Sequence, residues 1–200
     1  HDNVTGGYGQ ANNITIKRFE LYAPTPARVT LMGFAHAKDI VIEECVFHDI
    51  QDWHFLEINA CQNVYISKCI FYNYGSLAAG TEMLQLDNAR KDAFPWFGPN
   101  DNTVCDNIII EKCRFIGNRY INNDLFRPVA IGNHDITAKP QNVTIRECHF
   151  EDLRIAFKFE SGVNFVISDN TVVDCSCAIY GRGYIKSWCI SNNRFIGDSG

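Results

Sequence analysis

The sequence predicts an all-β fold, a single-stranded parallel β-helix of about seven coils that forms one domain over residues 1–200. Three observations support this prediction: a short phrase recurs along the chain, apolar residues alternate within it, and a second short strand precedes most of its copies. No long stretch of the chain shows the 3.6-residue apolar period of a helix.

The recurring phrase begins with Asn, continues through a triplet rich in β-branched residues and ends on Cys and Phe. Its clearest copies cover residues 39–47, 63–71, 107–115 and 142–150. All seven copies start at Asn13, Asp39, Asn63, Asn107, Asn142, Asn164 and Ser187, with separations of 26, 24, 44, 35, 22 and 23 residues. The shortest separations define one coil, so the two longest contain one coil plus inserted residues.

Apolar residues alternate inside each copy, as in Val64 and Ile66, followed by Cys69 and Phe71 after a bend. A period of two, rich in Val, Ile and Phe, predicts strands. The preceding strands cover residues 31–34, 55–59, 83–87, 129–132, 156–160 and 178–181. A coil this short cannot bury its own apolar side, so the coils are expected to stack at about 4.8 Å.

The chain from Asn13 onward resembles right-handed parallel β-helix proteins of the pectin-lyase-like group. Residues 54–57 and 82–87 also resemble a pattern found in bacterial and phage β-helix proteins that process polysaccharides. This resemblance implies a location outside the cell, on the cell surface or on a virion, and a homotrimer if the protein comes from a phage. The sequence departs from the polygalacturonase-like enzymes, because it lacks their vicinal Asp pair. It also lacks an evident Asp cluster for the calcium site of pectate-lyase-like enzymes.

Four cysteines take the same place in their copies of the phrase, and asparagines take it in the last two. These residues are Cys45, Cys69, Cys113, Cys148, Asn170 and Asn193. We expect them to stack as a ladder inside the solenoid, with the thiols acting as small buried groups. The odd total of nine cysteines argues against a complete set of disulfides. The Cys175-Ser176-Cys177 spacing does not fit a zinc knuckle.

Charge and hydropathy exclude two kinds of partner. The net charge is −5 and no basic run is present, so nucleic acid is not expected to bind. No stretch of 18 apolar residues occurs, so no membrane insertion is expected. We expect the chain to be a piece of a longer protein, because a solenoid needs end caps and none is recognisable.

Outward positions of the preceding strands are predicted to form a polar patch on the middle coils. One outward row contains Gly33, Glu57, Gln85, Ala130, Lys158 and Gly181, and the next contains Asn59, Asp87, Gly132, Glu160 and Gly183. In this alignment Ala130 and Gly132 leave a notch between polar coils. Glu57 and Asp87 become diagonal neighbours with Cα atoms about 7–8 Å apart.

Two carboxylates at this spacing are what glycoside hydrolysis requires, one as acid and the other as nucleophile or base. We therefore predict Glu57 and Asp87 as the catalytic pair of an enzyme that acts on a polysaccharide. A lyase would instead use His134 or Lys158 as the base that removes the C5 proton of an acidic sugar. No metal or cofactor is expected, except that a lyase could require calcium.

Three insertions belong to the coils that carry the notch: residues 88–104, 117–128 and 133–141. Insertions in solenoids gather on the binding face, which supports function at the polar patch. The predicted substrate-binding residues are His54, Glu82, Gln85, Trp96, Arg127, His134, Lys158 and Glu160. Two alternatives remain open: a non-catalytic glycan- or receptor-binding segment of a phage tail or surface adhesin, and a structural spacer.

Overall fold

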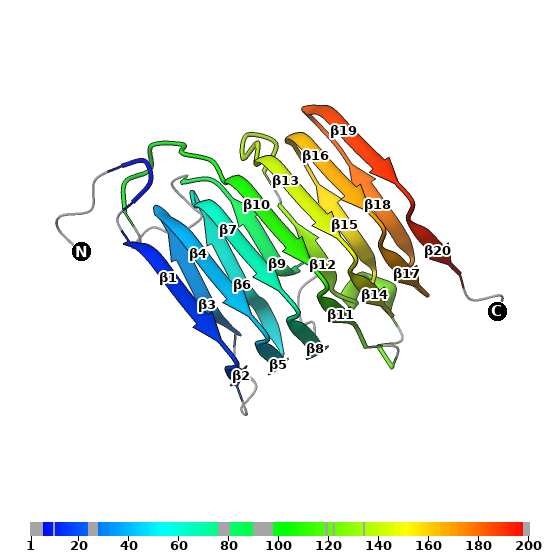
Figure 1. The fold of residues 1–200 in the computed structure, drawn as a ribbon. Helices are drawn as coiled ribbons and strands as arrows, with labels where there is room; N and C mark the ends of the chain where they lie inside the picture. The colour runs from blue at the N-terminus through cyan, green and yellow to red at the C-terminus, as the bar shows by residue number, and fades with distance from the viewer. Residues whose placement is uncertain are drawn as a thin grey trace.

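Three parallel β-sheets, named A, B and C here, run along the length of the computed structural model (Figure 1). The structure describes residues 6–9, 11–23, 28–75, 81–89, 98–118, 120–121, 123–133 and 135–197. Within these ranges there is no α-helix, and one 3₁₀ turn, η1 (Asp124–Phe126), precedes β12. This confirms the predicted all-β parallel solenoid of about seven coils.

Each full coil contributes one strand to each sheet, in the order C, A, B. Sheet A contains β1 (Ala11–Lys17), β4 (Ala37–Glu43), β7 (Gln62–Ser67), β10 (Asp106–Glu111), β13 (Gln141–Arg146), β16 (Gly162–Ser168) and β19 (Ile185–Ser191). Sheet B contains β2 (Glu20–Tyr22), β5 (Val46–Ile50), β8 (Ile70–Tyr74), β11 (Arg114–Ile116), β14 (His149–Glu151), β17 (Thr171–Val173) and β20 (Arg194–Ile196). Sheet C contains β3 (Arg28–Ala35), β6 (Asp52–Asn59), β9 (Glu82–Asp87), β12 (Val129–Gly132), β15 (Ile155–Phe159) and β18 (Cys177–Gly181).

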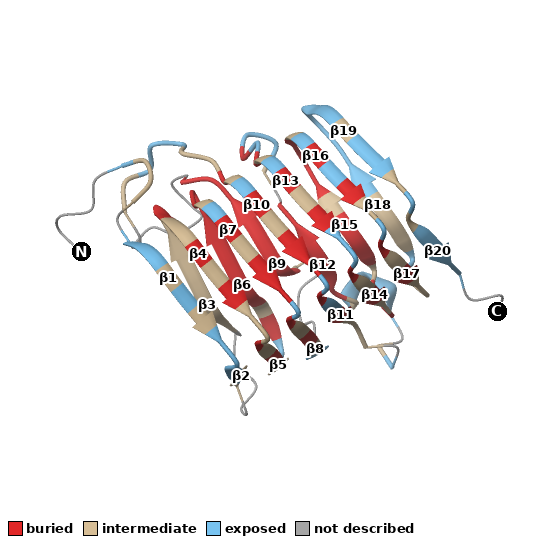
Figure 2. Ribbon diagram, in the orientation of Figure 1, coloured by how far each residue is buried: buried red, intermediate tan, exposed pale blue. Residues whose placement is uncertain are grey.

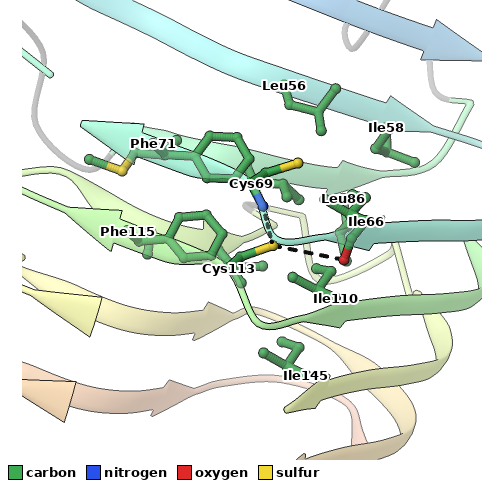
Figure 3. Close-up of a cluster of buried hydrophobic side chains, with 14 of the residues drawn as sticks. Leu56, Ile58, Ile66, Cys69, Phe71, Leu86, Ile110, Cys113, Phe115 and Ile145 are labelled. Carbon is green, nitrogen blue, oxygen red and sulfur yellow. Dashed lines mark hydrogen bonds between the residues drawn. The ribbon is translucent and has the colours of Figure 1, made fainter. Parts of the chain in front are cut away.

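Equivalent apolar residues stack from coil to coil in the core. Val64 of β7 pairs with Ile40 and Ile108 on the two neighbouring strands, and all three are buried. The clearest copies of the phrase each end on a phenylalanine, and these rings stack on one another from coil to coil. The centroids of neighbouring rings are 4.6–5.1 Å apart, for example between Phe71 and Phe115 (Figure 3). The repeated phrase thus specifies the core row by row.

The predicted internal ladder of cysteines and asparagines is confirmed. The backbone N–H of Cys69 donates to Sγ of Cys113 at 3.4 Å (Figure 3), and the N–H of Cys113 donates to Sγ of Cys148 at the same distance. The N–H of Cys148 then donates to Oδ1 of Asn170 at 2.9 Å, and Asn170 repeats this contact with Asn193 at 3.0 Å. All nine cysteines are free thiols, and burial raises the pKa of Cys61 to about 12.

The residue that starts each phrase has a left-handed backbone, with φ between 54° and 58°. Asn and Asp tolerate this conformation better than other residues that carry a side chain. Their side chains also connect successive coils: Nδ2 of Asn63 donates to Oδ1 of Asp39 at 2.8 Å, and Nδ2 of Asn107 donates to Oδ1 of Asn63 at 2.9 Å. The conformation and the coil-to-coil bonds together explain why the phrase begins with Asn.

Candidate functional site

The middle strands of sheet C are buried along their length (Figure 2), and their buried residues include polar and charged side chains. Glu57 is 4% exposed, Gln85 2% and Asp87 1%. Charged side chains rarely lie this deep unless they are paired or functional. We name as the sheet C patch the buried polar residues His54, Glu57, Asn59, Glu82, Gln85 and Asp87, together with the partly buried Lys158.

A bend within the strands of sheet C brings these residues onto one face. Two consecutive side chains enter the core at this point in each strand, for example Phe55 and Leu56 in β6 and Met83 and Leu84 in β9. Strand alternation therefore restarts, and the residues on either side of each core pair point outward. The bend explains how Glu82 joins Gln85 on the patch although they are three residues apart.

The register of β6 and β9 places the two predicted catalytic carboxylates diagonally. Glu57 pairs with Gln85, and Asn59 pairs with Asp87. Diagonal neighbours on one face of a sheet are about 7–8 Å apart. Nε2 of Gln85 donates to Oδ2 of Asp87 at 3.0 Å, and Oγ1 of Thr30 donates to Oε2 of Glu57 at 2.8 Å.

Thr30 is a site residue that the sequence analysis missed. It pairs with His54 just before the bend, at a position where strict alternation gives no reason to place it beside Glu57. The signal that could have found it is the pair of consecutive apolar residues, Leu31 and Met32, that marks the bend.

The predicted alignment of β12 was wrong by two residues. Ile131 pairs with Leu84 and with Phe157, so Gly132 takes the outward place beside Gln85 and Lys158. Ala130 instead lies in the core. The alignment of β18 needs the same kind of correction, since Tyr180 pairs with Lys158 where Gly181 was expected. The physical reason in both strands is the bend, because two consecutive core residues shift the alternation.

Gly132 lies under an ion pair that spans its coil. Nζ of Lys158 on β15 reaches Oε1 of Glu82 on β9 at 2.8 Å, although β12 separates these two strands. A β-carbon on Gly132 would overlap the carbonyl oxygen of Lys158 and would lie 3.2 Å from Cγ of Glu82. The expected notch between Ala130 and Gly132 is therefore not open: Ala130 lies in the core, and the side chain of Glu82 packs close to Gly132, where the Glu82–Lys158 pair crosses β12.

His54 and Asp87 connect the patch to the backbone around it. Nδ1 of His54 lies 2.6 Å from the carbonyl oxygen of Glu82. Oδ1 of Asp87 accepts from the N–H of Asn88 at 2.9 Å, at the start of the first insertion. The base of that insertion is closed by Ala89, whose N–H donates to the carbonyl of Thr103 at 2.8 Å.

Two of the remaining predicted residues, Glu160 and Arg127, make ion pairs outside the patch, and the other two lie outside the described residues. Nε of Arg182 pairs with Glu160 at 2.7 Å. Arg127 lies just before β12, and its guanidinium faces Asp124 and Asp152, each at 3.8 Å. Trp96 and His134 lie outside the described residues.

The described residues include no group of three or more His, Cys, Asp or Glu side chains that could hold a metal ion. Calcium in a lyase therefore stays a prediction. In the same part of the chain, no helix is long and apolar enough to cross a membrane.

The family comparison agrees with this architecture. The right handed beta helix region family matches residues 8–195, so the chain belongs to that family. No curated protein matches the chain.

Solved structures with the same fold include PfbA, a surface adhesin of Streptococcus pneumoniae. One PfbA structure superposes with a TM-score of 0.68 at 18% identity, over 82% of this chain and 42% of that one. A second has a TM-score of 0.61 at 16% identity, over 93% of this chain and 62% of that one. A structure titled glycoside hydrolase reaches a TM-score of 0.41 at 11% identity, over 82% of this chain and 37% of that one. The chain thus spans about half the length of the PfbA structures, and the likeness shows the fold alone.

Proposed function

We propose that the chain binds a polysaccharide at the sheet C patch and hydrolyses a glycosidic bond there, with Glu57 and Asp87 as the two reacting carboxyl groups. The observation that supports this most is the diagonal placement of two almost fully buried carboxylates on neighbouring strands. The spacing suits the acid and the base or nucleophile of glycoside hydrolysis.

The hydrogen bonds suggest how the two roles divide. Asp87 accepts from Nε2 of Gln85 and from the N–H of Asn88, and such N–H donors favour a charged carboxylate. In this proposal Asp87 is the nucleophile or base, and Glu57 is the acid that protonates the leaving oxygen. Thr30 would orient the carboxyl of Glu57 through its hydroxyl.

The test is a product assay on a panel of polysaccharides with wild type, Glu57→Gln and Asp87→Asn. Each variant should lose about 10²- to 10⁴-fold in rate, because each removes one proton-transferring or nucleophilic group. Glu43→Gln on sheet A is the matched control and should keep full activity. A wild type that releases no product from any polysaccharide, or active Glu57 and Asp87 variants, would refute the proposal.

A second candidate function is non-catalytic glycan binding on a cell surface. It is supported by the similarity of the fold to that of PfbA, a surface adhesin. Tight binding of a glycan by the wild type without any product would favour this candidate. Both functions place the protein outside the cell or on its surface.

A further inference from the structure

Beside Asp87 lies a buried amide whose polar atoms have no partner. Asn59 is 1% exposed, and among the described residues neither its Nδ2 nor its Oδ1 makes a hydrogen bond. Oδ1 of Asn88, also 1% exposed, has none either. Asn59 pairs with Asp87 across β6 and β9, and Asn88 follows Asp87 along the chain.

Two other buried amides of this solenoid, those of Asn133 and Asn170, make hydrogen bonds. Nδ2 of Asn133 donates to the carbonyl of Ser161 at 3.2 Å, and its Oδ1 accepts from the N–H of Glu160 at 2.7 Å. Asn170 donates from Nδ2 to the carbonyl of Ile145 at 3.0 Å. An unsatisfied buried amide destabilises a protein, so the two unpartnered atoms of Asn59, next to Asp87, are consistent with a role in binding a ligand.

The atoms without hydrogen-bond partners indicate which kind of ligand could bind here. Asn59 offers one donor group and one acceptor, and Asn88 adds a second acceptor. A pair of sugar hydroxyls can satisfy all of these atoms, since each hydroxyl both donates and accepts. A metal ion would use only the oxygens and would leave Nδ2 of Asn59 unsatisfied. An anionic sugar carboxylate would face two amide oxygens and the carboxylate of Asp87.

We infer that Asn59 and Asn88 form a subsite for the hydroxyl groups of a neutral sugar, next to Asp87. This inference rests on the proposed function and narrows it. A neutral sugar has no carboxylate to acidify its C5 proton, so the subsite favours hydrolysis over β-elimination.

The binding test uses Glu57→Gln as the parent, so that turnover does not consume the ligand. Its affinity for neutral hexose oligosaccharides and for uronic acid oligosaccharides is measured by calorimetry. We expect the neutral set to bind at least about 10-fold more tightly. Adding Asn59→Ala should weaken neutral binding about 10- to 100-fold, because two hydrogen bonds are lost. Asn164→Ala, on the exposed ladder of sheet A, is the control and should leave affinity unchanged.

A stability measurement separates a binding role from a structural one. If Asn59 serves a ligand, Asn59→Ala should leave Tm unchanged or raise it by up to about 4 °C. Asn133→Ala, which removes a satisfied amide, should lower Tm.

Three outcomes would overturn the subsite alone while the wild type still cleaves a polysaccharide: unchanged affinity in Asn59→Ala, tighter binding of uronic acid oligosaccharides, or calcium chloride alone raising Tm in an Asn59-dependent way. If the wild type cleaves nothing and the Glu57→Gln parent binds no oligosaccharide, the proposed function fails, and the subsite with it.

Discussion

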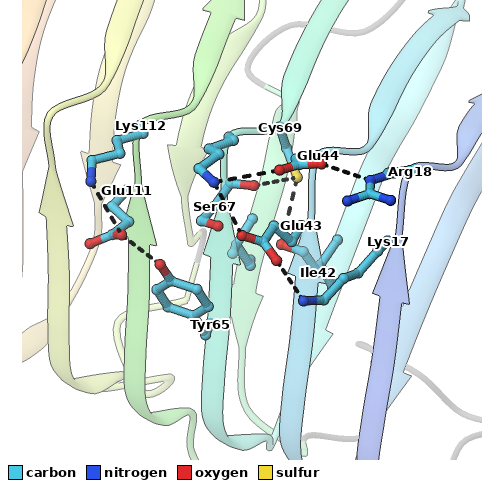
Figure 4. Close-up of polar contacts among 12 residues, drawn as sticks. Lys17, Arg18, Ile42, Glu43, Glu44, Tyr65, Ser67, Cys69, Glu111 and Lys112 are labelled. Atoms are coloured by element: carbon cyan, nitrogen blue, oxygen red, sulfur yellow. Dashed lines mark hydrogen bonds and ion pairs between the residues drawn. The ribbon is translucent and has the colours of Figure 1, made fainter.

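The outer faces of sheets A and C have the same parallel backbone pairing, but the lysines of their ion pairs differ in exposure to solvent. On sheet A, Nζ of Lys17 lies 2.7 Å from a carboxylate oxygen of Glu43 (Figure 4). Nζ of Lys68 reaches the same carboxylate at 3.4 Å. The ammonium side chains of both lysines are about half exposed. On sheet C, Lys158 and Glu82 are 14% and 1% exposed.

The difference in exposure has an energetic consequence. Half-exposed charges keep most of their hydration, so the ladders of sheet A contribute little to stability and maintain a soluble surface. Charges removed from water cost free energy that even good pairing only partly returns. The buried Glu82 and its partner Lys158 on sheet C are what the proposed function would require of a binding face.

The largest effect is expected when one charge is removed from each face. Lys158→Met takes the ammonium away from a buried carboxylate and should destabilise the protein by about 3–5 kcal/mol, a fall in Tm of roughly 10 °C. Lys17→Met on sheet A is the control, and its Tm should not change measurably. Calorimetry or thermal denaturation followed by circular dichroism provides both values.

The double variant Lys158→Met with Glu82→Gln sharpens this result. Because both charges are then absent, we expect it to regain part of the lost stability. A double variant that is less stable than the sum of both single changes would contradict this account of the pair.

A smaller effect is expected at the glycine beneath that pair. Gly132→Ala places a methyl group against the carbonyl oxygen of Lys158 and should cost about 1–3 kcal/mol through overpacking. Gly197→Ala, where a β-carbon meets nothing within 4 Å, is the control and should be close to neutral. Equal unfolding midpoints in urea for the two variants would show that the close approach at Gly132 is unimportant.

The smallest expected effect is the contribution of Glu111 on sheet A to the pH dependence of stability. The hydroxyl of Tyr65, and then the guanidinium of Arg146, lower the pKa of Glu111 (Figure 4 shows Tyr65 and Glu111). A lowered pKa in the folded state adds stability above the unfolded value of about 4.3, and this stability is lost as pH falls through the folded value.

Glu111→Gln should therefore reduce Tm at pH 7 by at most about 3 °C and should flatten the acid limb of the stability curve. Thermal denaturation of both proteins between pH 7 and pH 3 tests this. A variant whose stability declines below pH 5 as steeply as that of the wild type would show that other groups control the acid limb.

The sequence was sufficient to predict the rows of the core, because one phrase encodes each row. The Cys-to-Asn ladder follows from the position of Cys69 in its copy, and the Asn at each start follows from the left-handed backbone of residues such as Asn63. Because all copies of the phrase adopt the same backbone geometry, a copy aligned wrongly would place its apolar residues out of line with those of the other copies.

The sheet C patch could be predicted only in part. Glu57, Gln85 and Asp87 were located because β6 and β9 contain the same pattern, whereas β12 follows an insertion and offers only four residues to align. The Glu82–Lys158 pair could not be predicted, since it joins strands that are not neighbours. The lack of hydrogen-bond partners for the Asn59 side chain could not be predicted either. It depends on where the neighbouring donors and acceptors lie in space, which a sequence pattern does not contain.

The ladder of thiols and amides also gives the solenoid a direction. The backbone N–H of Cys69 finds its acceptor on the following coil, at Cys113, and the N–H of Cys148 finds its acceptor at Asn170. Each coil is therefore completed by residues that a ribosome adds later. During synthesis, the most recently made coil would always carry an unfilled donor until its successor arrived, so the solenoid would mature one coil behind translation.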